Sequence, residues 1–312
     1  MRSDKHTKKK KKWIKYLIIT FSILFIGLAA YLFTVYSSLN AALSSMQADS
    51  DRTLSPKRTD EIAFSKQEPF SVLLLGVDER EGDKGRSDTM IVLTVNPKVN
   101  SVKMLSIPRD TYTEIIGHGT TDKINHAYAF GGVDMSLDTV ENFLDIPIDY
   151  FVQINMEGFR DIVDAVGGVT VENDLDFSYE GFNFPVGTLN LNGEEALAYS
   201  RMRKEDPRGD FGRQLRQRQV IEGVINEGAS VSSLWNFQNI FEALGNNVKT
   251  NITFSEMVDV QKNYREATNS VEQISFTKGQ GQTIGGVWYL VIPDEEVIAV
   301  QDELKTHLDL NE

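Results

Sequence analysis

The chain has 312 residues, no cysteine and a formal net charge of −13. This length fits one large or two small domains with a sizeable buried core, and the lack of cysteine excludes disulfides, cysteine nucleophiles and thiolate metal sites. The acidic balance disfavours nucleic acid as a partner, because nucleic-acid binding needs a basic footprint.

The N-terminal segment combines a basic stretch with an apolar one. Residues 1–15 form a basic tail with five consecutive lysines, Lys8–Lys12. Residues 16–36 carry no charged side chain, and these 21 residues suffice to span a bilayer core as a helix. Because positive flanks stay in the cytoplasm, we expect a single-pass type II anchor in the plasma membrane, with the remaining chain outside. A cleaved signal peptide is the alternative, but its apolar stretch is usually shorter.

The chain beyond this segment is strongly acidic. Residues 1–16 hold eight of the 32 basic and one of the 45 acidic side chains, which leaves a net charge of about −20 on the rest. An acidic ligand can therefore bind only where this surface is locally positive or loaded with metal. Residues 37–68 are polar and without a clear period, so they predict a stalk between membrane and domain.

We expect residues 69–312 to form an extracytoplasmic folded domain. Apolar runs rich in β-branched residues predict strands covered on both faces, and longer amphipathic stretches predict helices. This alternation predicts an α/β fold, a three-layer α/β/α domain with a mixed central sheet. The predicted strands are 70–77, 89–95, 101–107, 150–155, 271–277 and 287–292, with a hairpin over 169–191. The predicted helices are 123–130, 135–144, 157–166, 193–203, 211–227, 232–244, 255–267 and 294–308.

Two acidic side chains flank the first connection between predicted strands. Asp78 directly follows the strand over 70–77, and ligands of open α/β sheets bind beyond the carboxyl ends of strands. Asp88 lies in the segment Gly85–Thr89, which the connection returns toward Asp78. Two carboxylates suit a hard cation such as Mg²⁺, which commonly shares its coordination sphere with water and substrate phosphates. Simple turn and capping roles are the alternative.

Arginine is concentrated in residues 201–218, which read RMRKEDPRGDFGRQLRQR and hold six arginines and one lysine. Guanidinium groups hold phosphate through two parallel hydrogen bonds, so a dense arginine segment in an acidic chain indicates a site for one particular anion. A solvated helix face laced with Glu205, Asp206 and Asp210 is the alternative.

The spacing within this segment separates its cations. Arg213 and Gln217 are four residues apart and share a helix face. Arg216 falls on a different side, so we expect Arg216 and Arg218 to be solvated surface charges. Arg109 follows the third predicted strand at the edge that carries the two carboxylates, although strand-end ion pairs are common and contribute little. Taken together, the cations and carboxylates predict a diphosphate site.

Five segments, in this order behind an N-terminal anchor, resemble the LytR-CpsA-Psr family. They are LLLGVD, GRSDTM, LSIPRDT, KINHAYAFGG and YSRMRKEDPRGDFGRQLRQRQ, and they lie between residues 70 and 226. The resemblance, which is closest to teichoic acid transferases of Gram-positive cells, implies that family's fold with a hydrophobic tunnel for a prenyl chain. It also implies transfer of a phosphate-linked glycopolymer from a polyprenyl diphosphate carrier to the C6 hydroxyl of peptidoglycan N-acetylmuramic acid.

The resemblance also implies roles for individual residues. Asp78 and Asp88 match acids associated with Mg²⁺, and Asp88 or Asp210 is the implied general base. The candidate catalytic residues are Asp88, Arg109 and Asp210. The candidate diphosphate-binding residues are Arg86, Arg109, Lys123, Arg201, Arg213 and Gln217.

Two other functions remain open from the sequence. A polyprenyl diphosphate phosphatase needs the same phosphate site but uses water as acceptor. A non-catalytic membrane regulator of gene expression is the second, although an outward-facing acidic domain disfavours direct contact with nucleic acid. The four histidines are scattered and form no nucleophilic triad, and we expect His126 on its helix to be structural.

Overall fold

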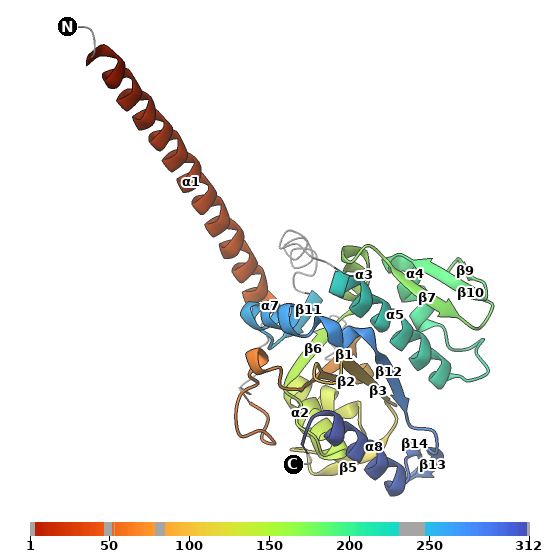
Figure 1. Ribbon diagram of the computed structural model, residues 1–312. Helices are drawn as coiled ribbons and strands as arrows, with labels where there is room; N and C mark the ends of the chain where they lie inside the picture. The colour runs from red at the N-terminus through yellow and green to blue at the C-terminus, as the bar shows by residue number, and fades with distance from the viewer. Residues whose placement is uncertain (1–3, 47–51, 53, 79–84, 231–246, 311–312) are drawn as a thin grey trace.

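The structure is a computed structural model that describes residues 4–46, 52, 54–78, 85–230 and 247–310. Its N-terminal part is a single long helix, α1 (Asp4–Met46), which projects away from the folded domain (Figure 1). Apolar side chains along α1, such as Phe21 and Phe25, are exposed. Within the described residues, no helix is long and apolar enough to cross a membrane. The membrane segment over 16–36 therefore stays a prediction.

A six-stranded mixed sheet forms the centre of the domain, in the order β11-β6-β1-β2-β3-β12 (Figure 1). Strands β1, β2 and β3 form an antiparallel meander, β6 runs parallel to β1, and β12 runs parallel to β3. The edge strand β11 is antiparallel to β6. The strands are β1 (Phe70–Val77), β2 (Ser87–Asn96), β3 (Ser101–Ile107), β6 (Tyr150–Ile154), β11 (Val248–Thr250) and β12 (Val271–Ser275).

Helices cover both faces of this sheet because alternate residues of each strand point to opposite sides. Leu73 and Leu75 of β1 enter a core with α2 and α8. Phe70 and Val72 of the same strand enter a second core with α5, α7 and η3. The predicted three-layer α/β/α arrangement with a mixed sheet is therefore confirmed. The helices are α2 (His126–Leu144), α5 (Asp210–Ser230), α7 (Phe254–Asn263), η3 (Arg265–Asn269) and α8 (Asp294–His307).

A smaller core lies beside the sheet and shares α5 with it. Strand β7 pairs with β10, and β8 pairs with β9 between them, so the predicted hairpin over 169–191 is two nested hairpins. Two helices complete this core. Its elements are α3 (Met156–Ala165), β7 (Val169–Asn173), β8 (Phe177–Tyr179), β9 (Phe182–Phe184), β10 (Gly187–Leu191) and α4 (Gly193–Arg201).

Two hairpins at the end of the sheet differ from the prediction. Strands β4 (Tyr112–Ile115) and β5 (Thr120–Lys123) form the first, and β13 (Gln280–Ile284) and β14 (Val287–Val291) form the second. Lys123, expected at the start of a helix, instead ends β5. The backbone of α2 kinks at Gly132, where φ is 66°, and this kink separates the two predicted helices.

The packed region begins before residue 69. Ser55 is buried and donates a hydrogen bond of 2.5 Å to Glu141 of α2, and Phe64 lies in the core between β1 and α7. The second half of the predicted stalk is thus part of the domain, held by contacts that are remote in sequence. The predicted helix over 232–244 lies outside the described residues.

Candidate functional site

A β-bulge positions Asp88 at the edge of the sheet. Gly76 pairs with Thr89, but the next residue of β1, Val77, pairs with Ser87, so Asp88 is an extra residue in β2. A Cβ at Gly76 would lie 2.9 Å from the Thr89 Cβ, so this close cross-strand approach requires glycine. Bulges re-aim the side chain of the extra residue, and here that residue is one of the predicted carboxylates.

Asp78 lies at the same edge, directly after β1. Its backbone N–H points to the Arg86 carbonyl at 3.5 Å, which extends the β1–β2 pairing beyond the bulge. Residues 79–84, which connect the two strands, lie outside the described part of the chain. The sheet therefore brings Asp78 and Asp88 to one edge, as the sequence predicted.

Alternating charges continue from Asp88 across the strand ends. Asp88 Oδ1 lies 2.9 Å from Arg109 Nη1, and Arg109 Nε lies 3.6 Å from Asp110 Oδ2. Asp110 Oδ1 then accepts a hydrogen bond of 2.6 Å from Lys123 Nζ. Three separate elements, β2, the β3–β4 turn and β5, supply these side chains, so the cluster depends on the fold and not on local sequence.

The first turn of α5 adds a second pair to this group. Arg213 Nη2 lies 2.7 Å from Asp210 Oδ1. Burial lowers the pKa of Arg109, but attraction to Asp88, Asp210 and Asp110 outweighs burial and raises it. For Arg213 burial dominates and lowers the pKa, helped by repulsion from Arg109. We call Asp88, Arg109, Asp110, Lys123, Asp210 and Arg213 the edge cluster.

Several polar atoms in and beside the edge cluster are buried without a hydrogen-bond partner among the described residues. They include Arg213 Nε, Asp210 Oδ1, whose contact with Arg213 lacks hydrogen-bond geometry, and Asn125 Oδ1. The backbone N–H of Asn125 donates to the Arg109 carbonyl at 3.3 Å, so its side chain belongs to the same neighbourhood. Buried polar atoms are normally paired, so this concentration indicates a place prepared for a polar ligand.

The remaining predicted site residues are not joined to the edge cluster by any described side-chain contact. Arg86 is exposed. Arg201 forms an exposed ion pair of 3.1 Å with Glu180. Gln217 is partly buried on α5, one turn beyond Arg213. Their roles at a diphosphate stay predictions.

Arg216 and Arg218 are not solvated, and that expectation was wrong. Arg216 is 1% exposed, and Arg218 is also buried. Arg218 donates to Ser106 Oγ at 2.9 Å and to Gln273 Oε1 at 3.0 Å. The side of α5 that we expected to face solvent packs instead against the sheet and the smaller core. The spacing of residues within one helix could not reveal this packing.

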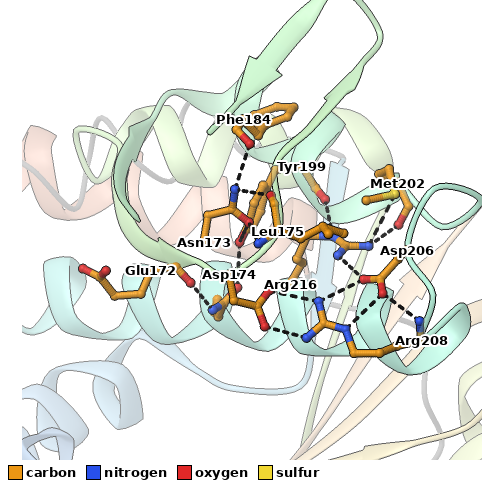
Figure 2. A network of polar contacts seen from close by, with 11 residues as sticks. Glu172, Asn173, Asp174, Leu175, Phe184, Tyr199, Met202, Asp206, Arg208 and Arg216 are labelled. Atoms are coloured by element: carbon orange, nitrogen blue, oxygen red, sulfur yellow. Dashed lines mark hydrogen bonds and ion pairs between the residues drawn. The ribbon is translucent and has the colours of Figure 1, made fainter. Parts of the chain in front are cut away.

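Arg216 forms the centre of a buried network in the smaller core (Figure 2). Its guanidinium donates to the carbonyls of Tyr199 and Met202 at 3.0 and 2.5 Å and to Asp206 Oδ2 at 2.6 Å. Arg208 joins the same Asp206 carboxylate at 3.0 Å. Gly212 makes room for this carboxylate, because a Cβ there would overlap it. Three of the six arginines in the segment, Arg208, Arg216 and Arg218, therefore stabilise the fold.

The network continues outward through the side chains of Asp174, Asn173 and Gln219. Arg208 holds both oxygens of Asp174 in a fork, with contacts of 2.6 and 2.9 Å. Tyr199 Oη donates to Gln219 at 2.8 Å. Asn173 Nδ2 donates to the carbonyls of Leu175 and Phe184 (Figure 2) and to that of Pro185. These contacts fix α4, α5 and the nested hairpins against one another.

An apolar cavity of about 380 Å³ lies between the sheet and the α5–α7 layer. Side chains of β1 and β2, such as Val72 and Leu93, form its floor. Ile225 of α5 and Val260 of α7 form part of its roof. The cavity and the edge cluster thus lie against different parts of the same helix.

The carboxylates of this edge fit a magnesium ion that is shared with a ligand. Asp78 and Asp88 offer hard oxygen donors. Among the described residues, no group of three or more acidic or histidine side chains could hold a metal by itself. Mg²⁺ commonly takes one or two carboxylates and completes its shell with water and substrate phosphates. The donor set suits a site formed jointly with a diphosphate.

Residues 32–306 match the LytR_cpsA_psr family. The chain belongs to this family. It is 51% identical over 309 residues, 99% of this chain and 100% of the relative, to the polyisoprenyl-teichoic acid–peptidoglycan teichoic acid transferase TagU of Bacillus subtilis (strain 168). The crystal structure of B. subtilis TagU has 54% identity and a TM-score of 0.64, and covers 77% of this chain and 97% of that one.

A second solved structure of this family carries a ligand. TagT bound to LI-WTA has 36% identity and a TM-score of 0.72, and covers 83% of this chain and 97% of that one. The family predicted from five short segments is thus confirmed over nearly the whole chain. Asp110 and Asn125 lie within two of those segments, yet neither was predicted as a site residue.

Proposed function

We propose that this protein is a phosphotransferase that attaches an anionic glycopolymer to peptidoglycan. The donor is a phosphate-linked polymer, wall teichoic acid in our proposal, carried on undecaprenyl diphosphate. The acceptor is the C6 hydroxyl of N-acetylmuramic acid, and the transfer is the final step of attachment. The identity of 51% to a named teichoic acid transferase, over the full length of both chains, supports this reaction.

The observation that carries the proposal is that the edge cluster, with its three cations, and an apolar cavity both lie along α5. Arg109 and Arg213 provide planar guanidinium groups for a diphosphate, and Lys123 provides an ammonium group on a flexible chain. The cavity offers apolar walls to part of an isoprenoid chain. A lipid diphosphate has an anionic head group and an apolar chain, so one ligand of this class would use both features of the protein.

Phosphoryl transfer depends mainly on positioning and on neutralising charge. In our proposal, Arg109 and Arg213 hold the diphosphate oxygens and stabilise the charge that develops on the departing polyprenyl phosphate. Each guanidinium has five N–H donors, so it can bind the ligand phosphates while keeping its carboxylate partner. Since the cluster is partly buried, each of these interactions is stronger than it would be in water.

We propose Mg²⁺ as the cofactor, held by Asp78 and Asp88. When bound, the ion would neutralise part of the diphosphate charge. Asp78→Asn should raise the Mg²⁺ concentration needed for half-maximal activity, and chelation should abolish activity reversibly. Full activity after chelation would contradict this assignment.

We also propose that residues 16–36 anchor the protein in the plasma membrane with the catalytic domain outside. The segment carries no charge, follows a basic tail, and has exposed apolar side chains on α1. An anchor keeps the site near the lipid carrier. Protease added to intact protoplasts should remove residues after 36, and protection of the domain would contradict this topology.

The test of the reaction uses the full-length protein in lipid nanodiscs with Mg²⁺. A polyprenyl-diphosphate-linked saccharide, labelled in the sugar, is incubated with peptidoglycan oligomers, and label bound to peptidoglycan is measured. We expect an adduct, and we expect Arg109→Ala to lose it while Arg160→Ala, on the surface of α3, retains it. Phosphate release that is independent of the acceptor, without adduct, would indicate a phosphatase instead.

A further inference from the structure

Asp122 and His126 form a carboxylate–imidazole pair beside the edge cluster, and the proposed reaction does not otherwise use either residue. His126 Nδ1 lies 2.7 Å from Asp122 Oδ2, and the two side chains are 21% and 23% exposed. Asp122 Oδ1 also accepts hydrogen bonds from the Lys123 backbone N–H at 2.8 Å and from Tyr289 Oη at 3.2 Å. The carboxylate is therefore held in place from three sides.

The contacts around Asp122 fix which nitrogen of His126 carries the proton. Burial raises the pKa of Asp122, but its hydrogen bonds with His126 and with the Lys123 backbone outweigh burial and lower it. An ionised carboxylate can only accept hydrogen bonds, so Nδ1 of a neutral His126 must donate. Its Nε2 then keeps a lone pair, and no described residue hydrogen-bonds to that nitrogen. This is the arrangement in which a carboxylate orients an imidazole base.

The backbone ties this pair to the segment that carries Arg109. The Asn125 N–H, immediately before His126, donates to the Arg109 carbonyl at 3.3 Å. The strand that supplies Tyr289 is joined to the same segment, because the Leu290 N–H donates to the Asp110 carbonyl at 2.9 Å. The residues before His126 and after Tyr289 are thus bonded to the backbone of Arg109 and Asp110, respectively.

The carboxylates first considered as bases are less suited to that role. Asp88 lies against Arg109 and Asp210 against Arg213, at 2.9 and 2.7 Å. The arginine contact occupies an oxygen of each carboxylate, and Asp88 is also assigned to Mg²⁺ in the proposed function. His126 instead has a carboxylate partner, which stabilises the imidazolium that forms when the base takes a proton.

We infer that His126 is the general base that activates the acceptor hydroxyl, and that Asp122 positions it. The inference rests on the proposed function. The hydroxyl oxygen attacks the phosphorus that carries the glycopolymer and forms a new P–O bond as its proton passes to His126 Nε2. The bond from this phosphorus to the bridging oxygen breaks, and polyprenyl phosphate leaves with the electron pair. The imidazolium later releases its proton to solvent.

The test compares His126→Gln with His118→Gln in the full-length protein in nanodiscs. His118 is a matched control, because its exposed ring stacks on Phe130 at 4.0 Å while the His126 ring meets the edge of the same Phe130. We expect His126→Gln to lower the transfer kcat by about 10²- to 10⁴-fold, the usual contribution of a general base. Binding of farnesyl diphosphate and the thermal midpoint should not change, and His118→Gln should keep the wild-type kcat.

Chemical rescue distinguishes a missing base from a disturbed fold. Added imidazole should raise the rate of His126→Ala in a saturable way and leave Asp122→Asn, which keeps its imidazole, unchanged. A wild-type kcat in His126→Gln would overturn the inference and leave the proposed function intact. If the wild-type protein forms no adduct with any acceptor, the proposed function fails and the inference fails with it.

Discussion

The edge cluster and the network around Arg216 are both chains of alternating charges, and both draw on the arginine segment. In the network, Arg216 is 1% exposed and each of its three guanidinium nitrogens donates to a protein acceptor. In the edge cluster, Arg213 is desolvated but its Nε has no described partner. These two arginines are three residues apart on one helix. Saturation of hydrogen bonds, and not the density of cations, separates a structural arginine from a ligand-binding one.

The largest effect should come from breaking the buried network. Arg216→Ala should lower the free energy of unfolding by about 3–5 kcal/mol, because it leaves the Asp206 carboxylate buried with fewer partners. Urea unfolding followed by circular dichroism measures this loss. The matched variant Arg213→Ala should cost less than about 1 kcal/mol, since burial already disfavours its charge. Equal losses for the two variants would contradict the distinction.

Substitutions in the edge cluster should lower the transfer activity, whereas substitutions in the network should lower stability. Arg109→Ala should reduce kcat/KM for transfer by about 10²- to 10³-fold, the cost of losing one preorganised group that stabilises developing charge. Its unfolding free energy should stay within about 1 kcal/mol of wild type. A variant that unfolds readily, and loses activity only for that reason, would place Arg109 with the structural arginines.

Acid should weaken the network as the pH falls from about 4 toward 2. Burial raises the pKa of Asp206, but hydrogen bonds from Arg208 and Arg216 outweigh it and lower the pKa from its usual value of 3.8 to about 2. A depressed folded pKa gives stability that is complete above about pH 4 and is lost as the pH falls toward 2, by about 2 kcal/mol in all. Stability curves for wild type and Asp206→Asn should differ in slope in this window. Parallel slopes would contradict the assignment.

The smallest effect on stability should come from Arg201. Its ion pair with Glu180 is exposed on both sides, so Arg201→Ala should change the unfolding free energy by less than about 1 kcal/mol. If Arg201 reaches the diphosphate, the same variant should raise KM for the donor about tenfold, as loss of one charge-assisted hydrogen bond would. Glu180→Ala is the control and should not raise KM. An unchanged KM in Arg201→Ala would remove this residue from the site.

The sequence predicted the layers of the fold because its strands are long, apolar and well bounded. It missed the β4–β5 hairpin, in which four-residue strands flank a turn and only one of the eight residues, Ile115, is buried. Short strands of this kind carry too little periodicity to be recognised. The placement of Lys123 was wrong for the same reason.

The candidate site was predicted in part. Asp78, Asp88 and Arg109 were placed at one sheet edge because strand order alone determines where strand ends meet. The burial of Arg216 could not be predicted, because its partners come from α4 and the following loop. The spacing of residues along the sequence does not show which side of α5 these partners cover. The pair of Asp122 and His126 was missed because β5 was not predicted and Asp122 lay outside every predicted element.

Helix α5 connects the edge cluster, the sheet and the apolar cavity. Arg213 in its first turn joins the edge cluster, Arg218 is bonded to β3, and Ile225 lines the apolar cavity. From Arg213 to Ile225 the helix rises about 18 Å. In the proposed function, this length sets the distance between the diphosphate of the bound carrier and the apolar part of its chain. Deleting one residue from α5 would rotate the two ends by about 100° relative to each other, so no ligand could satisfy both.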